Sequence, residues 1–471
     1  MKRLIFALLL ACACVIAQTH PAVAIHNAKI VTVSGPVIAK GTVVVRNGLI
    51  EAVGENVAVP PDAMLIEGEG LTVYPGLIDA LSTWGQPGAA PLTAAATAGG
   101  RGGRGANAAP TTTTAAVQAA VAAPTQVSRG PEDRPQTTSW VKIADEVTGT
   151  DRRIETARSA GFTTAVTFPT RGIFAGQGAV IDLLSGEKAG EMIVSSPVGQ
   201  YVSIGRGGGF GGGGGGGFPS ALMGYIAYVR QIYLDAEHYR LVKEAYAKNP
   251  VGMTRPEYDR ALEGVLDSPR ILLPANRMVE MDRMIRFAAE LKQPFILYGG
   301  RETFRPEAAE LLKKSGTAML LSMRWPEKAR DVDPEEVDSM RTLETRDKAP
   351  AAPAVLTKAG VRWAFYSDGL EQARDLQQAV KKALDNGLTR DQALRALTLS
   401  PAEIYGVANR LGSIEKGKIG NLVVTRGDLF DDRTRVEAII VDGRKYAPAP
   451  AAGFGGRGPA TDDPGNPGGM R

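Results

Sequence analysis

The side chains best suited to bind a transition-metal ion are few in this chain of 471 residues. It contains three histidines, His20, His26 and His238, and two cysteines, Cys12 and Cys14. The histidines are isolated from one another, and we interpret each as an ordinary surface or core side chain. Tight zinc sites combine several histidine and cysteine ligands, so the sequence predicts no such site. An all-oxygen site for magnesium or calcium stays open, although no motif for one is present.

The amino terminus indicates an exported protein. Lys2-Arg3 precede an apolar run over residues 4–16, and small residues follow near Ala17. This order is typical of a signal peptide, which we place at residues 1–19. The run is shorter than the ~20 apolar residues of a membrane-spanning helix, so no transmembrane span is predicted. We expect cleavage after Ala17 and a location in the periplasm or cell envelope, whereas cleavage before Cys12 would leave a lipid anchor there.

Charge and composition limit the classes of expected partner and indicate which segments are ordered. The formal net charge of +4 is small for this length, so we expect no nucleic-acid partner. A hydrophobic fraction of 44% is ample for a large core. Residues 86–138, 205–217 and 448–471 are rich in Ala, Gly, Thr or Pro. Such segments are typical of flexible inserts and of a disordered tail.

Short β-rich segments near both chain ends predict one small domain. They lie at residues 28–33, 42–45, 49–53, 71–74, 422–425 and 436–441. Asn47-Gly48 between the second and third segments is a strong hairpin signal. Neither end alone has enough strands, so we predict a composite β-sandwich domain of residues 20–74 and 411–447.

The centre of the chain alternates predicted strands and helices. Strands are predicted at residues 77–80, 162–168, 192–195, 271–275, 294–298, 318–322 and 362–366, and helices at 152–160, 222–247, 277–291, 306–314 and 370–384. Several helices end at a glycine before the next strand, as at Gly316 and Gly360. This α/β pattern predicts a TIM-like (β/α)8 barrel over residues 75–410, inserted into the composite domain. The pattern does not identify an eighth strand.

Three sequence motifs resemble the amidohydrolase superfamily. They are PGLIDALSTWG at residues 75–85, LGSIEKGKIGNLVV at 411–424 and VEAIIVDGRKY at 436–446. The likeness is to the branch of imidazolonepropionase-like and prolidase-like enzymes, and residues 218–239 resemble a helix of its exported members. The resemblance implies a distorted (β/α)8 barrel that hydrolyses amide, lactam or dipeptide-like bonds with one or two zinc or other divalent ions. Such an ion lowers the pKa of its bound water and polarises the carbonyl.

Carried over position by position, the resemblance implies that the metal-binding histidines are missing. Relatives have a His-x-His pair on the first strand, where this chain has Leu81 and Thr83. Pro274 stands where the fifth strand has its histidine, and no histidine occurs near Tyr298 on the sixth strand. Only Asp368, in the sequence YSDG, matches the carboxylate of the eighth strand. The bridging Lys or Glu of binuclear relatives has no identified counterpart, so we expect no metal cofactor.

These positions define the predicted site. Asp368 is the predicted catalytic residue, because catalytic groups of such barrels lie at the carboxyl ends of strands. The residues predicted to contact a small-molecule or peptide-like ligand at the barrel mouth are Leu81, Thr83, Pro274, Asn276 and Tyr298. Asp368 has an alternative role as the cap of a helix that begins at Gly369-Leu370.

Several functions stay open. The resemblance implies a hydrolase of carbon–nitrogen bonds, in which Asp368 would act as a general base with help from Asp79 or Glu280. The alternative is a non-catalytic protein that binds a small ligand, or that forms a complex with an active family member in the cell envelope. A homo-oligomer is compatible with either function. A purely structural role through the glycine-rich inserts is a third possibility.

Overall fold

The computed structural model describes residues 22–89, 134–186, 189–204, 219, 221–328, 337–370, 372–431 and 434–448. The predicted signal peptide, Cys12, Cys14 and His20 lie outside these residues, as do most of the two inserts and the tail. Export, periplasmic localisation and lipid anchoring therefore stay predictions. Within the described ranges, no helix is long and apolar enough to cross a membrane.

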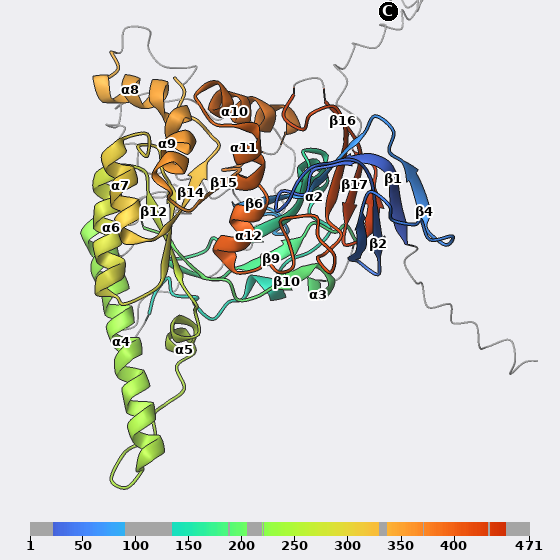
Figure 1. The fold of residues 1–471 in the computed structure, drawn as a ribbon. Coiled ribbons are helices and arrows are strands. Elements are labelled where there is room, and N and C mark those ends of the chain that lie inside the picture. Colours follow the sequence, from blue (N-terminus) through green and yellow to red (C-terminus); the bar gives the residue numbers. More distant parts are fainter. Residues whose placement is uncertain are drawn as a thin grey trace, which may run out of the picture.

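The two chain ends meet in one eight-stranded sheet, drawn in blue and red in Figure 1. Its strands are β1 (Val23–Ile30), β2 (Ile38–Arg46), β3 (Leu49–Gly54), β4 (Met64–Glu67), β5 (Thr72–Pro75), β16 (Leu422–Arg426), β17 (Arg435–Val441) and β18 (Arg444–Tyr446). Strand β16 pairs antiparallel with β5, which joins the carboxyl-terminal strands to the amino-terminal ones. Strands from both chain ends thus share one sheet, whereas the composite β-sandwich domain stays a prediction.

The turn between β2 and β3 follows from its sequence. Asn47 and Gly48 have φ angles of 51° and 78°. Gly adopts such positive angles freely and Asn does so more readily than most residues, which is why this pair favours tight hairpins.

The central region contains two further sheets. The first consists of β6 (Leu77–Ser82), β7 (Phe162–Thr167), β9 (Ala179–Asp182) and β10 (Ile193–Ser195). The second consists of β8 (Phe174–Gln177), β11 (Gln200–Val202), β12 (Ile271–Ala275), β13 (Phe295–Gly299), β14 (Ala318–Ser322) and β15 (Trp363–Tyr366). The pair β6–β7 and the run β11 to β15 are parallel.

The helices that cover these sheets begin and end at residues suited to those positions. They are α2 (Arg152–Ser159), α3 (Ala189–Met192), α4 (Leu222–Lys248), α5 (Arg260–Leu266), α6 (Met278–Glu290), α7 (Pro306–Ser315), α8 (Met340–Lys348), α9 (Ala352–Ala359), α10 (Ala373–Asp385), α11 (Arg390–Ala396) and α12 (Leu399–Tyr405). Helix α7 starts at Pro306, whose missing N–H would have no helical partner there. Gly316 and Gly360 end α7 and α9 in the left-handed conformation, as the sequence predicts.

The sheet arrangement confirms a mixed α/β fold and departs from the prediction in one respect. Residues 192–195 were expected to contribute a parallel barrel strand, but β10 pairs antiparallel with β9. The strands β8, β9 and β11 are too short to give a clear pattern and were not predicted. The described strands form separate sheets, so closure into an eight-stranded barrel stays a prediction.

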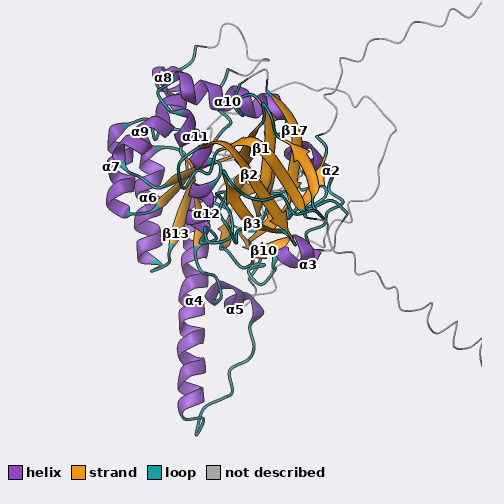
Figure 2. Cartoon of the chain, turned by 45° about the vertical axis from the view of Figure 1, so that its right-hand side comes forward, coloured by secondary structure: helices purple, strands orange, loops and turns teal. Residues whose placement is uncertain are grey.

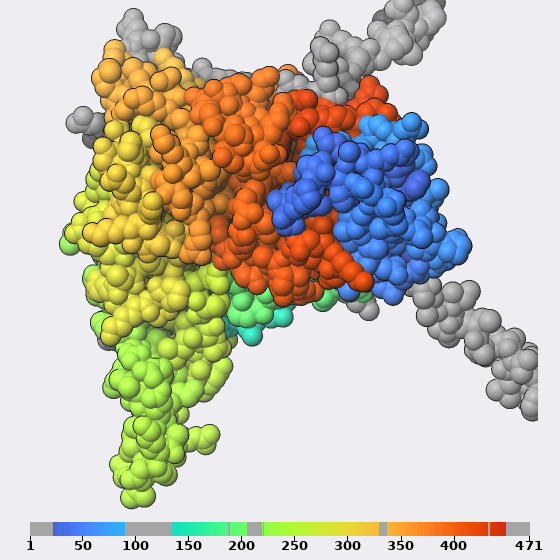
Figure 3. Space-filling view, in the orientation of Figure 1, coloured from blue at the N-terminus to red at the C-terminus, as the bar shows by residue number. Residues whose placement is uncertain are grey.

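Part of helix α4 projects from the rest of the molecule (Figure 2). Its carboxyl-terminal half extends well beyond the body, and the chain returns from its tip towards α5 (Figures 2 and 3). The return segment and α5 contact this half of the helix, as the hydrogen bond from the Tyr239 hydroxyl to Glu263 shows. The rest of the helix packs against the central region through a row of aromatic and aliphatic side chains.

Candidate functional site

Two carboxylates and two serines lie together where β6 and β15 meet. Asp79 on β6 accepts hydrogen bonds from the backbone N–H of Ser367 (2.9 Å) and of Leu81 (3.3 Å). The Ser367 hydroxyl donates to the other Asp79 oxygen over 2.5 Å. Asp79 is fully buried, and this burial raises its pKa to about 7 despite the three donors. Such a group changes its charge near neutral pH.

Asp368 lies beside this pair in an unusual backbone conformation. Its φ angle is 51°, and it is only 1% exposed. The Ser322 hydroxyl, at the end of β14, donates to Asp368 Oδ2 over 2.5 Å, and Arg324 Nε donates to the Asp368 carbonyl over 3.0 Å. The alternative role as a helix cap is wrong, because the next helix begins later with Gln372 as its cap.

Glu280, the other predicted assistant, has a local structural role. Its carboxylate accepts hydrogen bonds from the backbone N–H groups of Asn276 (3.0 Å) and Arg277 (3.1 Å) at the start of α6. It also pairs with the Arg277 guanidinium at 2.8 Å. Glu280 thus satisfies backbone N–H groups at the start of α6 that the helix itself cannot.

Tyrosines fill the interior next to Asp368. The hydroxyls of Tyr298 on β13 and Tyr201 on β11 lie 2.9 Å apart, and their rings are 5.7 Å apart between centroids. Tyr366 at the end of β15 is fully buried. Burial raises the pKa of Tyr201 to about 12, and it raises the pKa of Tyr298 and of Tyr366 well above the usual value. All three hydroxyls therefore keep their protons at neutral pH.

Leu81 and Pro274, which stand at positions of expected histidines, are both in or next to this interior. Leu81 is 1% exposed and belongs to the same apolar cluster as Tyr201, Tyr298 and Tyr366. Pro274 is half-buried on β12 and lies opposite Tyr298 in the sheet register. Neither side chain carries an atom that can coordinate a metal ion.

Asn276 follows directly after β12 and is 5% exposed. Its side chain lies against Gly299, where a Cβ atom would come within 2.5 Å of Asn276 Oδ1. Gly299 also has a φ angle of 114°, which favours glycine. The close approach of Asn276 therefore depends on the glycine at the end of β13.

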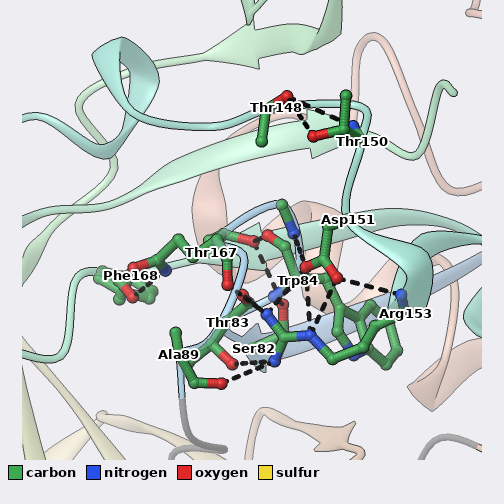
Figure 4. A network of polar contacts seen from close by, with 12 residues as sticks. Ser82, Thr83, Trp84, Ala89, Thr148, Thr150, Asp151, Arg153, Thr167 and Phe168 are labelled. Carbon is green, nitrogen blue, oxygen red and sulfur yellow. Dashed lines mark hydrogen bonds and ion pairs between the residues drawn. The ribbon is translucent and has the colours of Figure 1, made fainter. Parts of the chain in front are cut away.

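Thr83 is held by an arginine from α2 (Figure 4). Arg153 Nη1 donates to the Thr83 hydroxyl over 3.0 Å, and Nη2 donates to the Thr83 carbonyl over 2.8 Å. The same guanidinium donates to the carbonyls of Gln86 (2.6 Å) and Ala89 (2.9 Å) and pairs with Asp151 at 2.8 Å. The hydroxyl predicted to contact a ligand is thus part of a network that fixes the loop after β6.

Sequence reasoning predicted some of these residues and missed others. The structure brings Leu81, Tyr298 and Asp368 to one interior region, and it places Thr83 in the separate arginine network. The partners Tyr201, Ser322 and Arg153 were missed, because they come from distant segments. Ser367 could have been found, since it stands next to Asp368 in the sequence YSDG.

The two histidines in the described part of the chain lie on β1 and α4, away from these strand ends. His26 on β1 lies in the eight-stranded sheet, where its Nδ1 is 2.9 Å from the Thr42 hydroxyl. His238 lies on the exposed side of α4. Among the residues that the structure describes, no three His, Cys, Asp or Glu side chains are grouped closely enough to hold a metal ion.

A cavity of about 990 Å³ lies apart from this interior, between α6, α7 and α8. Its lining includes the apolar side chains of Val279, Met340 and Leu343. Glu302 also lines it and is 3% exposed, and its carboxylate accepts two hydrogen bonds from Arg341, of 2.7 and 2.8 Å. The residues predicted to bind a ligand do not line this cavity.

Comparisons with known proteins show what this chain and its fold are similar to. Residues 282–446 match the Amidohydrolase family. The structure is similar to an amidohydrolase from Thermotoga maritima MSB8, with a TM-score of 0.67 and 23% identity over 90% of this chain and 99% of that chain. A prolidase complexed with N-methylphosphonate-L-proline has a TM-score of 0.52 and 16% identity, over 91% of this chain and 100% of that chain. These likenesses show the fold of the amidohydrolase superfamily.

A shorter likeness connects the chain with a curated relative. The chain is 35% identical over 72 residues to the adenine deaminase of Moorella thermoacetica (strain ATCC 39073 / JCM 9320). The match covers 15% of this chain and spans only 12% of the length of that enzyme. Together with the family match, it supports the resemblance to amidohydrolase-family hydrolases that the sequence motifs indicate.

Proposed function

We propose that this chain is an exported member of the amidohydrolase superfamily that has lost metal-dependent hydrolysis of carbon–nitrogen bonds. It acts in the cell envelope as a non-catalytic subunit or binding protein. The observation that carries this proposal is the packed interior at the ends of β6, β12 and β13. There Leu81 and the Tyr201–Tyr298 pair occupy the region where the resemblance places the metal ligands.

The chemistry of these side chains supports the proposal. Leu81 and Pro274 have no donor atom, and the Tyr298 hydroxyl keeps its proton and is hydrogen-bonded. Thr83 is engaged by a guanidinium, whose positive charge repels a divalent cation. A catalytic zinc site needs about three protein ligands with an open position for water. This set of side chains supplies neither the ligands nor the opening.

Metal analysis combined with hydrolysis assays tests the proposal. The full-length chain would be purified after growth with zinc and manganese, and its metal content measured by mass spectrometry. Hydrolysis of Xaa-Pro dipeptides and deamination of adenine would be measured alongside a metal-loaded amidohydrolase as the positive control. We expect metal far below one equivalent and no turnover above the protein-free blank. One equivalent of metal, with turnover that a chelator removes, would overturn the proposal.

A second candidate is a hydrolase with a rearranged, metal-independent site. The observation that favours it is the contact between Asp79 and the Ser367 hydroxyl, with an Asp79 pKa of about 7. A carboxylate of this pKa can accept a proton from a hydroxyl near neutral pH. If turnover without metal were detected, the variants Asp79→Asn and Ser367→Ala should abolish it, while Asp62→Asn at an exposed ion pair should not.

A further inference from the structure

Helix α4 carries apolar side chains on two opposite faces. Its buried face consists of Tyr225, Tyr228, Val229, Ile232, Tyr233, Ala236 and Tyr239. On the other side, Met223, Leu234 and Leu241 are 84%, 59% and 50% exposed. A helix that packs on one side only normally has a polar outer face. A second apolar row in the solvent indicates a further contact.

Leu234 and Leu241 belong to a line of exposed side chains with the spacing of a coiled-coil seam, whereas Met223 lies outside this line. The residues Ala227, Gln231, Leu234, His238, Leu241, Ala245 and Lys248 follow one another at steps of four and three, and all of them are exposed. The line contains apolar side chains at Ala227, Leu234, Leu241 and Ala245, and polar ones at the other three positions. This alternation keeps one line of side chains facing a partner helix over three heptads. Leu234 and Leu241 occupy successive positions of the same heptad type, where leucine favours two-stranded coiled coils.

The seam lies on a part of the molecule that a partner helix can reach. The α4 helix of 27 residues is about 40 Å long at ~1.5 Å per residue. Its distal half, which includes His238, Leu241, Ala245 and Lys248, extends away from the body (Figure 3). On the same arm, Val251 and Tyr258 of the return segment are 82% and 78% exposed.

We propose that this face of α4 pairs with the same face of a second copy of the chain, as a parallel two-stranded coiled coil. A parallel pair places Leu234 against Leu234 and Leu241 against Leu241 of the second copy. It also brings Arg230, on one flank of the seam, towards Asp235 on the other flank of the second copy. Two-fold symmetry forms this complementary contact twice.

The charges beside the seam are compatible with this pairing. Within one copy Arg230 pairs with Glu290, and Asp235 accepts a hydrogen bond of 2.7 Å from Gln231 and pairs with Arg134 at 3.6 Å. The contact between Arg230 and Asp235 of the two copies therefore adds to ion pairs that already exist within each copy. The attraction between the copies comes from the paired leucines. Because a seam of three heptads is small, we expect a reversible dimer. This inference concerns assembly and holds whether or not the chain is catalytic.

Sedimentation velocity of the full-length chain between ~1 and ~100 μM tests the pairing. We expect the sedimentation coefficient to rise from that of a monomer to that of a dimer. The variant Leu234→Glu/Leu241→Glu should raise the dissociation constant at least about tenfold, since it places acidic side chains opposite each other. The matched control is Val37→Glu/Leu65→Glu, which changes two side chains of similar exposure, 52% and 54%, just before β2 and on β4. Circular dichroism would verify that both double variants are folded.

A cross-link tests the parallel orientation. In a chain with Cys12→Ser and Cys14→Ser, the substitution Leu241→Cys should form a disulfide-linked dimer on mild oxidation, because the two copies of residue 241 face each other. A cysteine at Val37 should not form one. The proposal is overturned if the chain remains monomeric at ~100 μM, or if the leucine double variant dimerises like the wild type. It is equally overturned if a dimer forms without the cross-link at residue 241.

Discussion

The substitution Asp79→Asn tests how the buried carboxylate under β15 affects the stability of the fold. Asp79 has no exposed surface, and its oxygens accept from two backbone N–H groups and from the Ser367 hydroxyl. Asparagine has the shape of a protonated aspartate. Its carbonyl can accept from the two N–H groups, and its amide can donate to the Ser367 oxygen. The variant should therefore behave like the wild type with Asp79 permanently neutral.

The size of the effect follows from the pKa of Asp79. The ordinary value is 3.8, and burial raises the pKa to about 7 in the folded protein. Since the folded state binds this proton more tightly than the unfolded state, the stabilisation is complete below about pH 4 and is lost as the pH rises to about 7. At about 1.4 kcal/mol for each tenfold change in proton affinity, the free energy of unfolding falls by about 4 kcal/mol across this range.

Asp182 on β9 should also make the free energy of unfolding fall as the pH rises. It is 3% exposed, and burial raises its pKa to about 7. It accepts hydrogen bonds from Asn421 Nδ2 (2.6 Å) and the Thr164 hydroxyl (3.0 Å), and so joins β7 and β9 to the chain that returns to the small sheet. Asp182→Asn should remove its share of the pH dependence, independently of Asp79.

Urea denaturation followed by tryptophan fluorescence at about pH 5 and about pH 8 measures these effects. We expect the wild type to lose stability between the two pH values, and Asp79→Asn to lose about 3 kcal/mol less, because the rest of the effect falls below about pH 5. Asp62→Asn is the control, because Asp62 is exposed and its pKa is lowered by Arg46, so its ionisation ends below this range. If Asp79→Asn and the wild type lose stability in parallel, Asp79 is ionised in the folded protein and the reasoning fails.

Two further predictions concern the packed strand ends. Tyr298→Phe should lower the free energy of unfolding by about 1–3 kcal/mol, because the Tyr201 hydroxyl loses its partner inside the core. Urea denaturation measures this effect, and an unchanged midpoint would contradict the prediction. Arg153→Met should lower the free energy of unfolding by about 3 kcal/mol or more, since Asp151 would be left buried without its cation. Thermal unfolding measures this effect. A Tm equal to that of the wild type would exclude a structural role for the network.

Much of the fold could be predicted from local sequence signals. The Asn47-Gly48 turn and the glycines at the ends of α7 and α9 act over a few residues, so they can be recognised in one sequence. The strands β8, β9 and β11 have only three or four residues each. Their positions depend on pairing with distant segments, which composition and periodicity do not encode.

The same distinction applies to the site. Leu81, Tyr298 and Asp368 lie in one region, and each of them follows or ends a predicted strand. Ser367, in contrast, bonds to Asp79 across 288 positions of the chain, and Arg153 reaches Thr83 across 70. No local pattern indicates such partners. The pKa of Asp79 depends on burial by the assembled sheets, so it could not be inferred from the sequence.

Several polar groups at these strand ends are satisfied by one another. The Ser367 hydroxyl bonds to Asp79, the Ser322 hydroxyl to Asp368, and the Tyr201 and Tyr298 hydroxyls to each other. A buried polar group without a partner is costly, so a strand end that loses metal ligands remains stable only if other partners replace the ion. Introducing single histidines here would break apolar packing and internal hydrogen bonds before any ion could bind. This interior is therefore packed as a core, and the proposed loss of metal chemistry depends on how its side chains pair with one another.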